Sequence, residues 1–324
     1  MIVIDADAID RVLTRAGMVE ALRLGFREAV TTPVRHHHPM PRAGEDTAML
    51  LLMPAWSDGR DGLTDDAVTG VKIVSVVPGN AKRGLASVVG SYVLMSGVSG
   101  APLAVLDGTR LTLWRTAGAS ALAADFLARA DARKLAMMGA GALAEHLIEA
   151  HTSIRPIEEV AIWNRSPDKA AALAARFAGR PFRVTAVADP DAAIADADVV
   201  STATMSTTPV VHGAHLKPGA HVDLVGGYTP AMREADDAAI ARARVFVDTR
   251  AGATHEAGDI TQPLASGLLT PERIVGDLAD LCRGTVAGRG TAEEITLFKS
   301  VGTALEDLVA ARLVHRALAD RRTG

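Results

Sequence analysis

The spacing of apolar and polar positions differs between the two halves of the chain. The first half contains short apolar runs separated by turn residues, at 48–53, 68–77, 88–95 and 102–106. This spacing predicts a meander of largely antiparallel strands. Ahead of it, residues 7–31 carry an apolar stripe and predict a helix that ends at Pro33; the stripe consists of Met18, Val19, Leu22, Phe26 and Val30.

Helices and strands alternate beyond Thr116. An Ala-rich helix is expected at 116–130, followed by strands at 134–138, 159–163, 182–187, 198–204, 220–225 and 244–248. Such alternation predicts an α/β fold with a parallel, doubly wound sheet of the Rossmann type. Residues 291–319 look helical again, with an interruption at 300–303. We therefore place a domain boundary near Thr116.

Composition narrows the class of protein. A hydrophobic content of 48%, a charged content of 22% and a net charge of −4 are ordinary for a soluble chain and give no sign of a nucleic-acid or membrane partner. The N-terminus lacks the basic start of a signal peptide, and we expect a cytoplasmic protein. The single cysteine, Cys282, excludes an internal disulfide. His36–His38 invite a metal interpretation, but adjacent histidines converge poorly and we expect no metal.

The apolar run at 135–138 stops at a glycine-rich turn before a helix-forming stretch. That turn reads Gly139, Ala140, Gly141, Ala142, Leu143, Ala144, which is G-x-G-x-x-A between a strand and a helix. The first glycine permits the tight turn and the second permits backbone approach to a pyrophosphate. The helix N-terminus adds free N–H groups for phosphate. A glycine-rich turn of any α/β fold is the alternative, but we favour a dinucleotide site.

The residues that end the second strand of this unit bear on the choice of nucleotide. They are Asn164, Arg165 and Ser166, with Lys169 one turn later. An acid at this place would accept from the ribose hydroxyl of NAD, whereas Arg accommodates the 2′-phosphate of NADP. An exposed basic turn is the alternative. We favour NADPH and leave NADH open.

Two further strand ends are candidates for cofactor contact. Ligands of doubly wound sheets bind at the carboxyl ends of strands. These ends carry Thr202, Ala203 and Thr204 in one case and Val225, Gly226 and Gly227 in the other. Either segment taken alone is more often simple turn chemistry.

Lys72 stands in an apolar run, on the same face as Val74 and Val76. It is either a charged residue of an edge strand or a desolvated amine with a lowered pKa that is suited to proton transfer. Arg42 and Arg115 offer bidentate recognition of a carboxylate or phosphate. Most arginines face solvent, and spacing alone does not decide among these interpretations.

With these residues in view, the chain resembles the ornithine cyclodeaminase/μ-crystallin family. The matching segments run in order along nearly the whole chain: 41–42, 52–54, 71–74, 78–80, 100–104, 113–117, the glycine loop, 160–165, 226–227, 256–259 and 298–302. The resemblance implies a substrate and dimerisation domain of residues 1–115 and 301–324 around a Rossmann domain of residues 116–300. It also implies a homodimer.

The resemblance further assigns roles to residues. It implies that Lys72 and Arg42 belong to the substrate site, and that Arg115 binds a substrate carboxylate or a cofactor phosphate. Thr116 and the loop 139–142 look like pyrophosphate contacts. Val301 and Gly302 would approach the nicotinamide.

Two departures from ornithine cyclodeaminases matter. This chain has Leu51 where they carry a Glu before Leu-Met-Pro, and Tyr228 where they carry an Asp after Val-Gly-Gly. Losing both acids disfavours a diamino-acid substrate. The segment 225–232 is similar to Δ1-pyrroline-2-carboxylate reductases, and Asn-Arg-Ser resembles the NADPH-using branch.

The resemblance therefore implies a reductase of cyclic ketimines. Its expected reactions convert Δ1-pyrroline-2-carboxylate to L-proline and Δ1-piperideine-2-carboxylate to L-pipecolate. Lys72, Tyr228 or a water could supply the proton. The rivals are an ornithine cyclodeaminase, an alanine-type dehydrogenase, and a μ-crystallin-like protein that binds NADPH and a ligand with little turnover.

Overall fold

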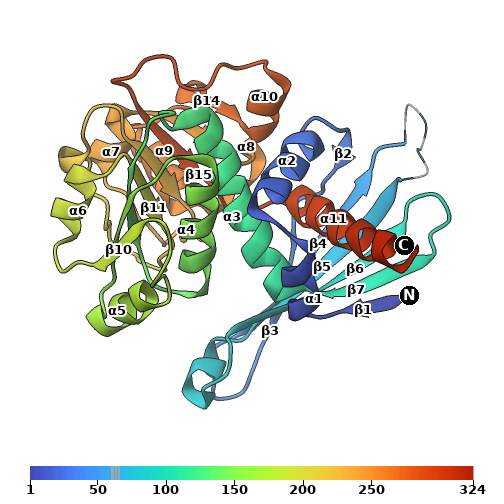
Figure 1. Ribbon diagram of the computed structural model, residues 1–324. Coiled ribbons are helices and arrows are strands. Elements are labelled where there is room, and N and C mark those ends of the chain that lie inside the picture. Colours follow the sequence, from blue (N-terminus) through green and yellow to red (C-terminus); the bar gives the residue numbers. More distant parts are fainter. Residues whose placement is uncertain (60–61, 63, 65, 324) are drawn as a thin grey trace. The chain divides into compact units, whose positions relative to one another are not determined.

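The computed structural model describes residues 1–59, 62, 64 and 66–323, and Figure 1 shows its helices and strands. The chain divides into two compact units, Met1–Arg115 with Thr303–Gly324, and Thr116–Gly302. The chain passes from the first unit to the second at 115/116, which is the expected boundary. It returns at 302/303, two residues after the expected 300/301. Among the described residues, no helix is both long and apolar enough to cross a membrane.

The first unit is built on a mixed sheet. In its described part seven strands take the order β1-β7-β6-β5-β4-β2, with β3 paired to β4. Its pairs are antiparallel except β1 with β7, and β1, β2 and β3 were not predicted. The strands are β1 (Ile2–Ile4), β2 (Val30–Thr31), β3 (His36–Met40), β4 (Ala48–Ser57), β5 (Val68–Val76), β6 (Val88–Ser96) and β7 (Pro102–Asp107).

Helices cover one face of this sheet. The C-terminal helix α11 (Ala304–Thr323) packs on β4, β5 and β6, as Figure 1 shows, and α1 (Ala6–Val12) and α2 (Arg15–Gly25) pack on α11. A short 3-10 helix, η1 (Pro78–Arg83), joins β5 to β6. Directly paired residues share a face of a sheet. One row of directly paired residues lies beneath α11, and all of its members are buried. The row consists of Ile4, Leu106, Tyr92, Lys72 and Met53.

The predicted single helix at 7–31 is wrong. Leu13 and Thr14 are extended, and the Thr14 side chain accepts a hydrogen bond from the amide of Gly17. This N-cap starts α2 as a second helix. The expected stripe is buried along α2 and at its C-cap residue Phe26, but Val30 belongs to β2.

The helix expected at 116–130 begins eight residues earlier, as α3 (Gly108–Leu127). The sequence Asp107-Gly108 resembles a turn signal, but the Asp107 side chain accepts from the amide of Arg110 at 2.7 Å and so caps the helix. Arg115 and Thr116 therefore lie inside a helix, where their backbones are fixed.

The second unit has the expected parallel sheet. Its described strands take the order β10-β9-β8-β11-β12-β15-β13-β14, and every pair is parallel. The strands are β8 (Lys134–Met138), β9 (Glu159–Trp163), β10 (Arg183–Ala186), β11 (Val199–Thr202), β12 (His221–Leu224), β13 (Ala243–Val247), β14 (Ile274–Asp277) and β15 (Ile295–Lys299). The order reverses between β8 and β11, which is where such sheets bind ligands.

Helices connect these strands. They are α4 (Ala142–Ile154), α5 (Pro167–Ala175), α6 (Pro190–Asp196), α7 (Asp237–Arg242), α8 (Arg250–Glu256), α9 (Gly258–Ser266) and α10 (Leu278–Arg283), with 3-10 turns η2 (Gly213–His215) and η3 (Pro271–Arg273). The prediction of helix across 291–319 is wrong at its start, because 295–299 forms β15 between β12 and β13. All five residues of β15 are buried, and so alternation of apolar and polar positions could not reveal the strand.

Candidate functional site

Lys72 lies inside the sheet of the first unit. Its strand β5 has β4 on one side and β6 on the other, which excludes the edge-strand interpretation. The residue is 2% exposed. Its Nζ lies 2.7 Å from Asp307 Oδ2 and donates to Asp307 Oδ1 at 2.9 Å and to Thr112 Oγ1 at 3.4 Å. Lys72 is thus a buried amine in contact with a carboxylate.

The surroundings of Lys72 lower its pKa from 10.5 to about 8. Burial is the largest cause, followed by the positive charge of Arg115. Asp307 opposes them by its charge and its hydrogen bond, and Arg35 lowers the pKa further. An amine that titrates near neutral pH is suited to exchange a proton with a substrate.

Arg115 is 5% exposed and is held by two acids at the start of α11. Its Nε donates to Asp307 Oδ1 at 3.0 Å, and its Nη1 donates to Glu306 Oε2 at 2.7 Å. Neither acid was predicted to have a role. The signal for them was present, because two adjacent carboxylates interrupt the apolar stripe of this helix.

The remaining two candidate catalytic residues are more exposed. Arg42 follows β3, and its Nη1 lies 4.0 Å from Glu45 Oε2. Among the described residues it makes no hydrogen bond or ion pair to Lys72 or Arg115. Tyr228 belongs to the second unit, in the loop after β12, and is 38% exposed. The structure therefore brings Lys72 and Arg115 together, while the roles of Arg42 and Tyr228 stay predictions.

The glycine loop has the geometry that a dinucleotide requires. Gly139 has φ +115°, and a Cβ there would lie 2.7 Å from the Ala203 carbonyl oxygen. Only glycine fits such a position. Gly141 is the N-cap residue of α4, and a Cβ there would meet no atom within 4 Å. The open space in front of this helix N-terminus fits a pyrophosphate.

The neighbouring positions complete the loop. Ala140 precedes Gly141, and Ala142 and Leu143 begin the 13-residue helix α4. Behind them Ala144 is fully buried, as close packing of the helix on β8 requires. Thr116, in α3, is mostly buried.

The tip of β9 presents unengaged donors. The Asn164 side chain donates to the carbonyl of Ser166 and so shapes the turn. Ser166 is the N-cap residue of α5, but its side chain makes no capping hydrogen bond. The side chains of Arg165 and Lys169 are exposed and have no ion pair within the described parts of the chain. The Ser166 hydroxyl and the cationic groups of Arg165 and Lys169 are therefore available to an anionic ligand.

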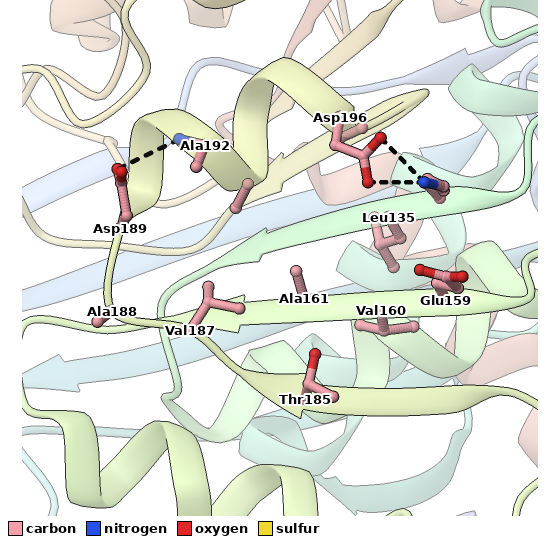
Figure 2. A pocket seen from close by; sticks show the side chains of 13 residues that line it. Leu135, Glu159, Val160, Ala161, Thr185, Val187, Ala188, Asp189, Ala192 and Asp196 are labelled. Carbon is pink, nitrogen blue, oxygen red and sulfur yellow. Dashed lines mark hydrogen bonds and ion pairs between the residues drawn. The ribbon is translucent and has the colours of Figure 1, made fainter.

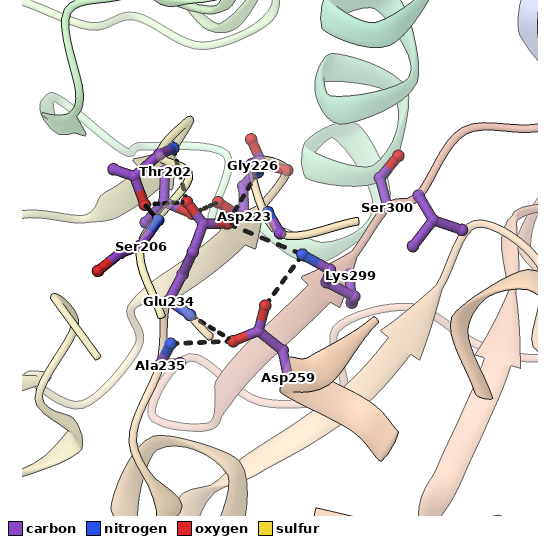
Figure 3. A network of polar contacts seen from close by, with 12 residues as sticks. Thr202, Ser206, Asp223, Gly226, Glu234, Ala235, Asp259, Lys299 and Ser300 are labelled. Atoms are coloured by element: carbon purple, nitrogen blue, oxygen red, sulfur yellow. Dashed lines mark hydrogen bonds and ion pairs between the residues drawn. The ribbon is translucent and has the colours of Figure 1, made fainter. Parts of the chain in front are cut away.

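The ends of β11 and β12 are tied together by Glu234, as Figure 3 shows. Glu234 Oε1 accepts from the amide and the hydroxyl of Thr204, both at 2.8 Å. Its Oε2 accepts from the amides of Gly226 at 2.8 Å and Gly227 at 3.1 Å. The candidate segments 202–204 and 225–227 thus form one structure, which the sequence did not reveal.

A buried ion pair supports Glu234. Lys299 Nζ lies 3.0 Å from Asp259 Oδ2 and 3.7 Å from Glu234 Oε2, and all three side chains are buried (Figure 3). Asp259 Oδ1 in turn accepts from the amides of Glu234 and Ala235. The loops at this edge of the sheet are therefore fixed by charged groups that contact no solvent.

Val301 and Gly302 are held in a similar way. Their amides donate to Asp248 Oδ2 at 2.7 Å and 2.6 Å, and the Ser300 hydroxyl donates to the same atom. Asp248 follows β13 and is fully buried. Its carboxylate fixes the segment that the resemblance places near a nicotinamide.

A surface pocket of about 500 Å³ lies elsewhere in the second unit (Figure 2). It extends over β8, β9 and β10 beside α6, and the ion pair of Lys134 with Asp196 crosses it. None of the candidate site residues lines it. We assign it no part in the predicted chemistry.

His36, His37 and His38 form most of β3, and no group of acidic, His or Cys side chains within the described residues is arranged to hold a metal.

The chain is similar to characterised proteins over nearly its whole length. Residues 8–322 match the model of the ornithine cyclodeaminase/mu-crystallin family. A Δ1-pyrroline-2-carboxylate reductase of Paracoccus denitrificans is 39% identical over 305 residues, covering 92% of this chain and 94% of the relative.

Two solved structures are similar to the whole chain. One is the Thermococcus litoralis Δ1-pyrroline-2-carboxylate reductase in complex with NADH and L-proline, with a TM-score of 0.92 and 29% identity; it covers 99% of this chain and 98% of its own. The other is a dimer of an archaeal alanine dehydrogenase with bound NAD, with a TM-score of 0.89 and 26% identity, covering 99% and 97%.

Proposed function

We propose that this chain, which belongs to the ornithine cyclodeaminase/mu-crystallin family, is an NAD(P)H-dependent reductase of cyclic ketimines. Its substrates would be Δ1-pyrroline-2-carboxylate, reduced to L-proline, and Δ1-piperideine-2-carboxylate, reduced to L-pipecolate. The relatives named for the first of these reactions support the substrate class.

The observation that carries the proposal is the buried ammonium group of Lys72 beside Arg115. A cyclic ketimine acid offers a carboxylate for an arginine and a nitrogen that must gain a proton on reduction. Leu51 supports the same substrate class. It pairs directly with Val74, so it shares the face of Lys72, and it leaves the second amino group of ornithine without a carboxylate there.

In the proposed reaction the carboxylate of the substrate is bound by Arg42 and Arg115, which fixes the C=N bond for attack. Reduced nicotinamide dinucleotide supplies the hydride when bound. The carbon gains that hydride and the nitrogen gains a proton, which gives the cyclic amino acid. Lys72 donates the proton in this scheme, with Tyr228 and a water as the other candidate donors.

The cofactor half of the reaction is assigned to the second unit. Gly139 and Gly141 would admit the pyrophosphate, and the ordered segments 202–204, 225–226 and 301–302 would bind the nicotinamide end. Arg165, Ser166 and Lys169 favour the 2′-phosphate of NADPH, because a cation and a hydroxyl donor stand free where NAD enzymes place an acid. The preference for NADPH over NADH is our proposal from this turn.

We also propose that the protein is a homodimer. The sheet face opposite Lys72 carries a row of directly paired apolar residues, Val3, Val105, Val93, Val71 and Pro54. Val3 is 82% exposed, and the others are only partly buried. A second copy would cover this face. A monomeric mass by light scattering at micromolar concentration would refute the dimer.

Replacement of Lys72 tests the proposed function. The Lys72→Ala variant should lose at least about a hundredfold in kcat, as expected for a lost proton donor, with NADPH affinity changed by less than about threefold. Lys82→Ala, at an exposed site in η1, is the matched control and should keep its turnover. Turnover in Lys72→Ala equal to that of the wild type would remove Lys72 from the mechanism.

An amino-acid dehydrogenase is the second candidate, favoured by the similarity to alanine dehydrogenase. It predicts reduction of NAD(P) with L-alanine and release of ammonia. A steady-state assay with alanine, run beside the ketimine, separates the two reactions.

A further inference from the structure

Asp307 contacts both candidate cations of the first unit. Its Oδ1 accepts from Lys72 Nζ at 2.9 Å and from Arg115 Nε at 3.0 Å, and its side chain is fully buried. We propose that Asp307 is a positioning residue that holds Lys72 as an ammonium ion, aimed beside the guanidinium of Arg115. The proposal rests on the proposed function and adds the residue that sets the state of the proton donor.

The charges of the cluster show why one carboxylate matters so much. Asp307 and Glu306 balance Lys72 and Arg115, and all four side chains are buried. Without the Asp307 carboxylate, two cations would share Glu306, which binds Arg115. Arginine does not lose its proton in proteins. Lys72 would lose the carboxylate that its ammonium group contacts and would keep the guanidinium of Arg115 beside it, so its amine would lose the proton more readily. A neutral amine cannot donate the proton that reduction requires.

The other groups that face Lys72 do not replace Asp307. Burial, Arg115 and Arg35 all lower the pKa of Lys72, and Asp307 raises it. Tyr92 is the direct partner of Lys72 on β6. Burial, followed by the charge of Asp307, raises the pKa of Tyr92 well above its ordinary value, and so its phenol stays neutral. Thr112 carries no charge. Asp307 is therefore the carboxylate that keeps Lys72 protonated.

Replacing Asp307 should change the pH dependence of turnover. The active enzyme carries the Lys72 ammonium group, so kcat falls as pH rises through the pKa of Lys72, which is about 8. In Asp307→Asn this fall should move to lower pH by about one unit or more, because a negative charge beside the amine is lost. Activity should drop about fivefold or more at pH 8 and recover toward pH 6.

Glu306→Gln is the matched control. It removes the neighbouring buried carboxylate, which accepts from Arg115, whereas the Lys72 amine contacts Asp307. Its turnover should fall with pH near the same value as that of the wild type. A purely structural role of Asp307 would instead lower kcat of Asp307→Asn equally at every pH, and that result would overturn the proposal.

A second measurement does not depend on turnover. The 13Cε chemical shift of Lys72, assigned with a Lys72→Arg variant, reports its titration in labelled protein. In Asp307→Asn this titration should lie below that of the wild type, and an unchanged titration would refute the proposal. If the wild type reduces no ketimine, the proposed function fails while this titration still tests Asp307.

Should Asp307→Asn not fold, Asp307→Glu keeps the test open. This variant retains a carboxylate, on a side chain that is longer by one methylene group. We expect a lower kcat and a fall of turnover with pH near that of the wild type. A shift of that fall to lower pH despite the retained carboxylate would contradict the proposal.

Discussion

Lys299 and Asp259 form an ion pair of 3.0 Å in which neither side chain reaches solvent. The pair links the end of β15 to the start of α9, and the other oxygen of Asp259 binds the amides of Glu234 and Ala235. Charged groups, rather than apolar packing alone, thus fix the loops at the carboxyl edge of the second sheet.

Removing Asp259 should be severely destabilising. Asp259→Ala leaves Lys299 buried with Glu234 at 3.7 Å as its remaining acid, and a broken buried pair costs about 3–5 kcal/mol. Urea unfolding measures this loss. Asp168→Ala, at an exposed position in α5, is the control and should change stability by no more than about 0.5 kcal/mol. An Asp259→Ala variant as stable as this control would contradict the assigned role.

His221 should make the protein sensitive to acid. Its side chain is fully buried at the start of β12, and burial lowers its pKa from 6.5 to about 3. The unfolded chain binds a proton below pH 6.5, whereas the folded chain does not until about pH 3. Stability due to neutral His221 is therefore complete above pH 6.5 and is lost progressively toward pH 3.

Replacement of His221 isolates this effect. Between pH 6 and 4, the free energy of unfolding should fall less steeply with decreasing pH in His221→Asn than in the wild type. The difference in slope corresponds to about one proton that the unfolded wild-type chain binds and the folded chain does not. Chemical unfolding at several pH values measures the slope. Identical slopes in variant and wild type would mean that His221 is protonated in the folded protein.

The two glycines of the pyrophosphate loop should respond differently to alanine. Gly139→Ala forces a Cβ against the Ala203 carbonyl and strains a backbone at φ +115°, and we expect a loss of at least about 1–3 kcal/mol in stability. Gly141→Ala should fold normally, because its Cβ enters open space, but should bind NADPH more weakly. Thermal unfolding and calorimetric titration separate the two effects. Unchanged NADPH affinity in Gly141→Ala would argue against a pyrophosphate at this place.

Arg165 should determine which dinucleotide is preferred. Loss of a charged hydrogen bond to a 2′-phosphate costs about 1.5–3 kcal/mol. Arg165→Asp should therefore raise KM for NADPH about tenfold to a hundredfold, with KM for NADH little changed. Arg11→Asp makes the same charge change at an exposed position of α1 and serves as the control. Equal effects on both cofactors would show that the turn at β9 does not read the phosphate.

Local sequence signals predicted much of the fold. The strand-turn-helix setting of Gly139 and Gly141 identified the nucleotide fold. The run around Lys72 predicted a strand in which Lys72 shares a face with Val74 and Val76, but it left open whether that lysine is buried or belongs to an edge strand. Strand β15 was missed because a fully buried strand has no alternation. The start of α3 was missed because Asp107-Gly108 also resembles a turn.

The chemical partners in the site were harder to predict. Asp307 lies 235 residues from Lys72, and Glu234 is 30 residues from Thr204. Spacing along a chain carries no information about such contacts, since they depend on how strands and helices pack. The sequence revealed which residues were unusual, and the structure revealed their partners.

The most direct test of the proposed function follows NADPH absorbance when the purified protein meets freshly generated Δ1-pyrroline-2-carboxylate. A parallel reaction holds ornithine and oxidised cofactor and is assayed for ammonia. We predict rapid loss of NADPH with formation of L-proline, and no ammonia from ornithine. Ammonia from ornithine without reduction of the ketimine would contradict the assignment and make deamination the activity. No reaction in either mixture would leave a protein that binds its ligands without turnover.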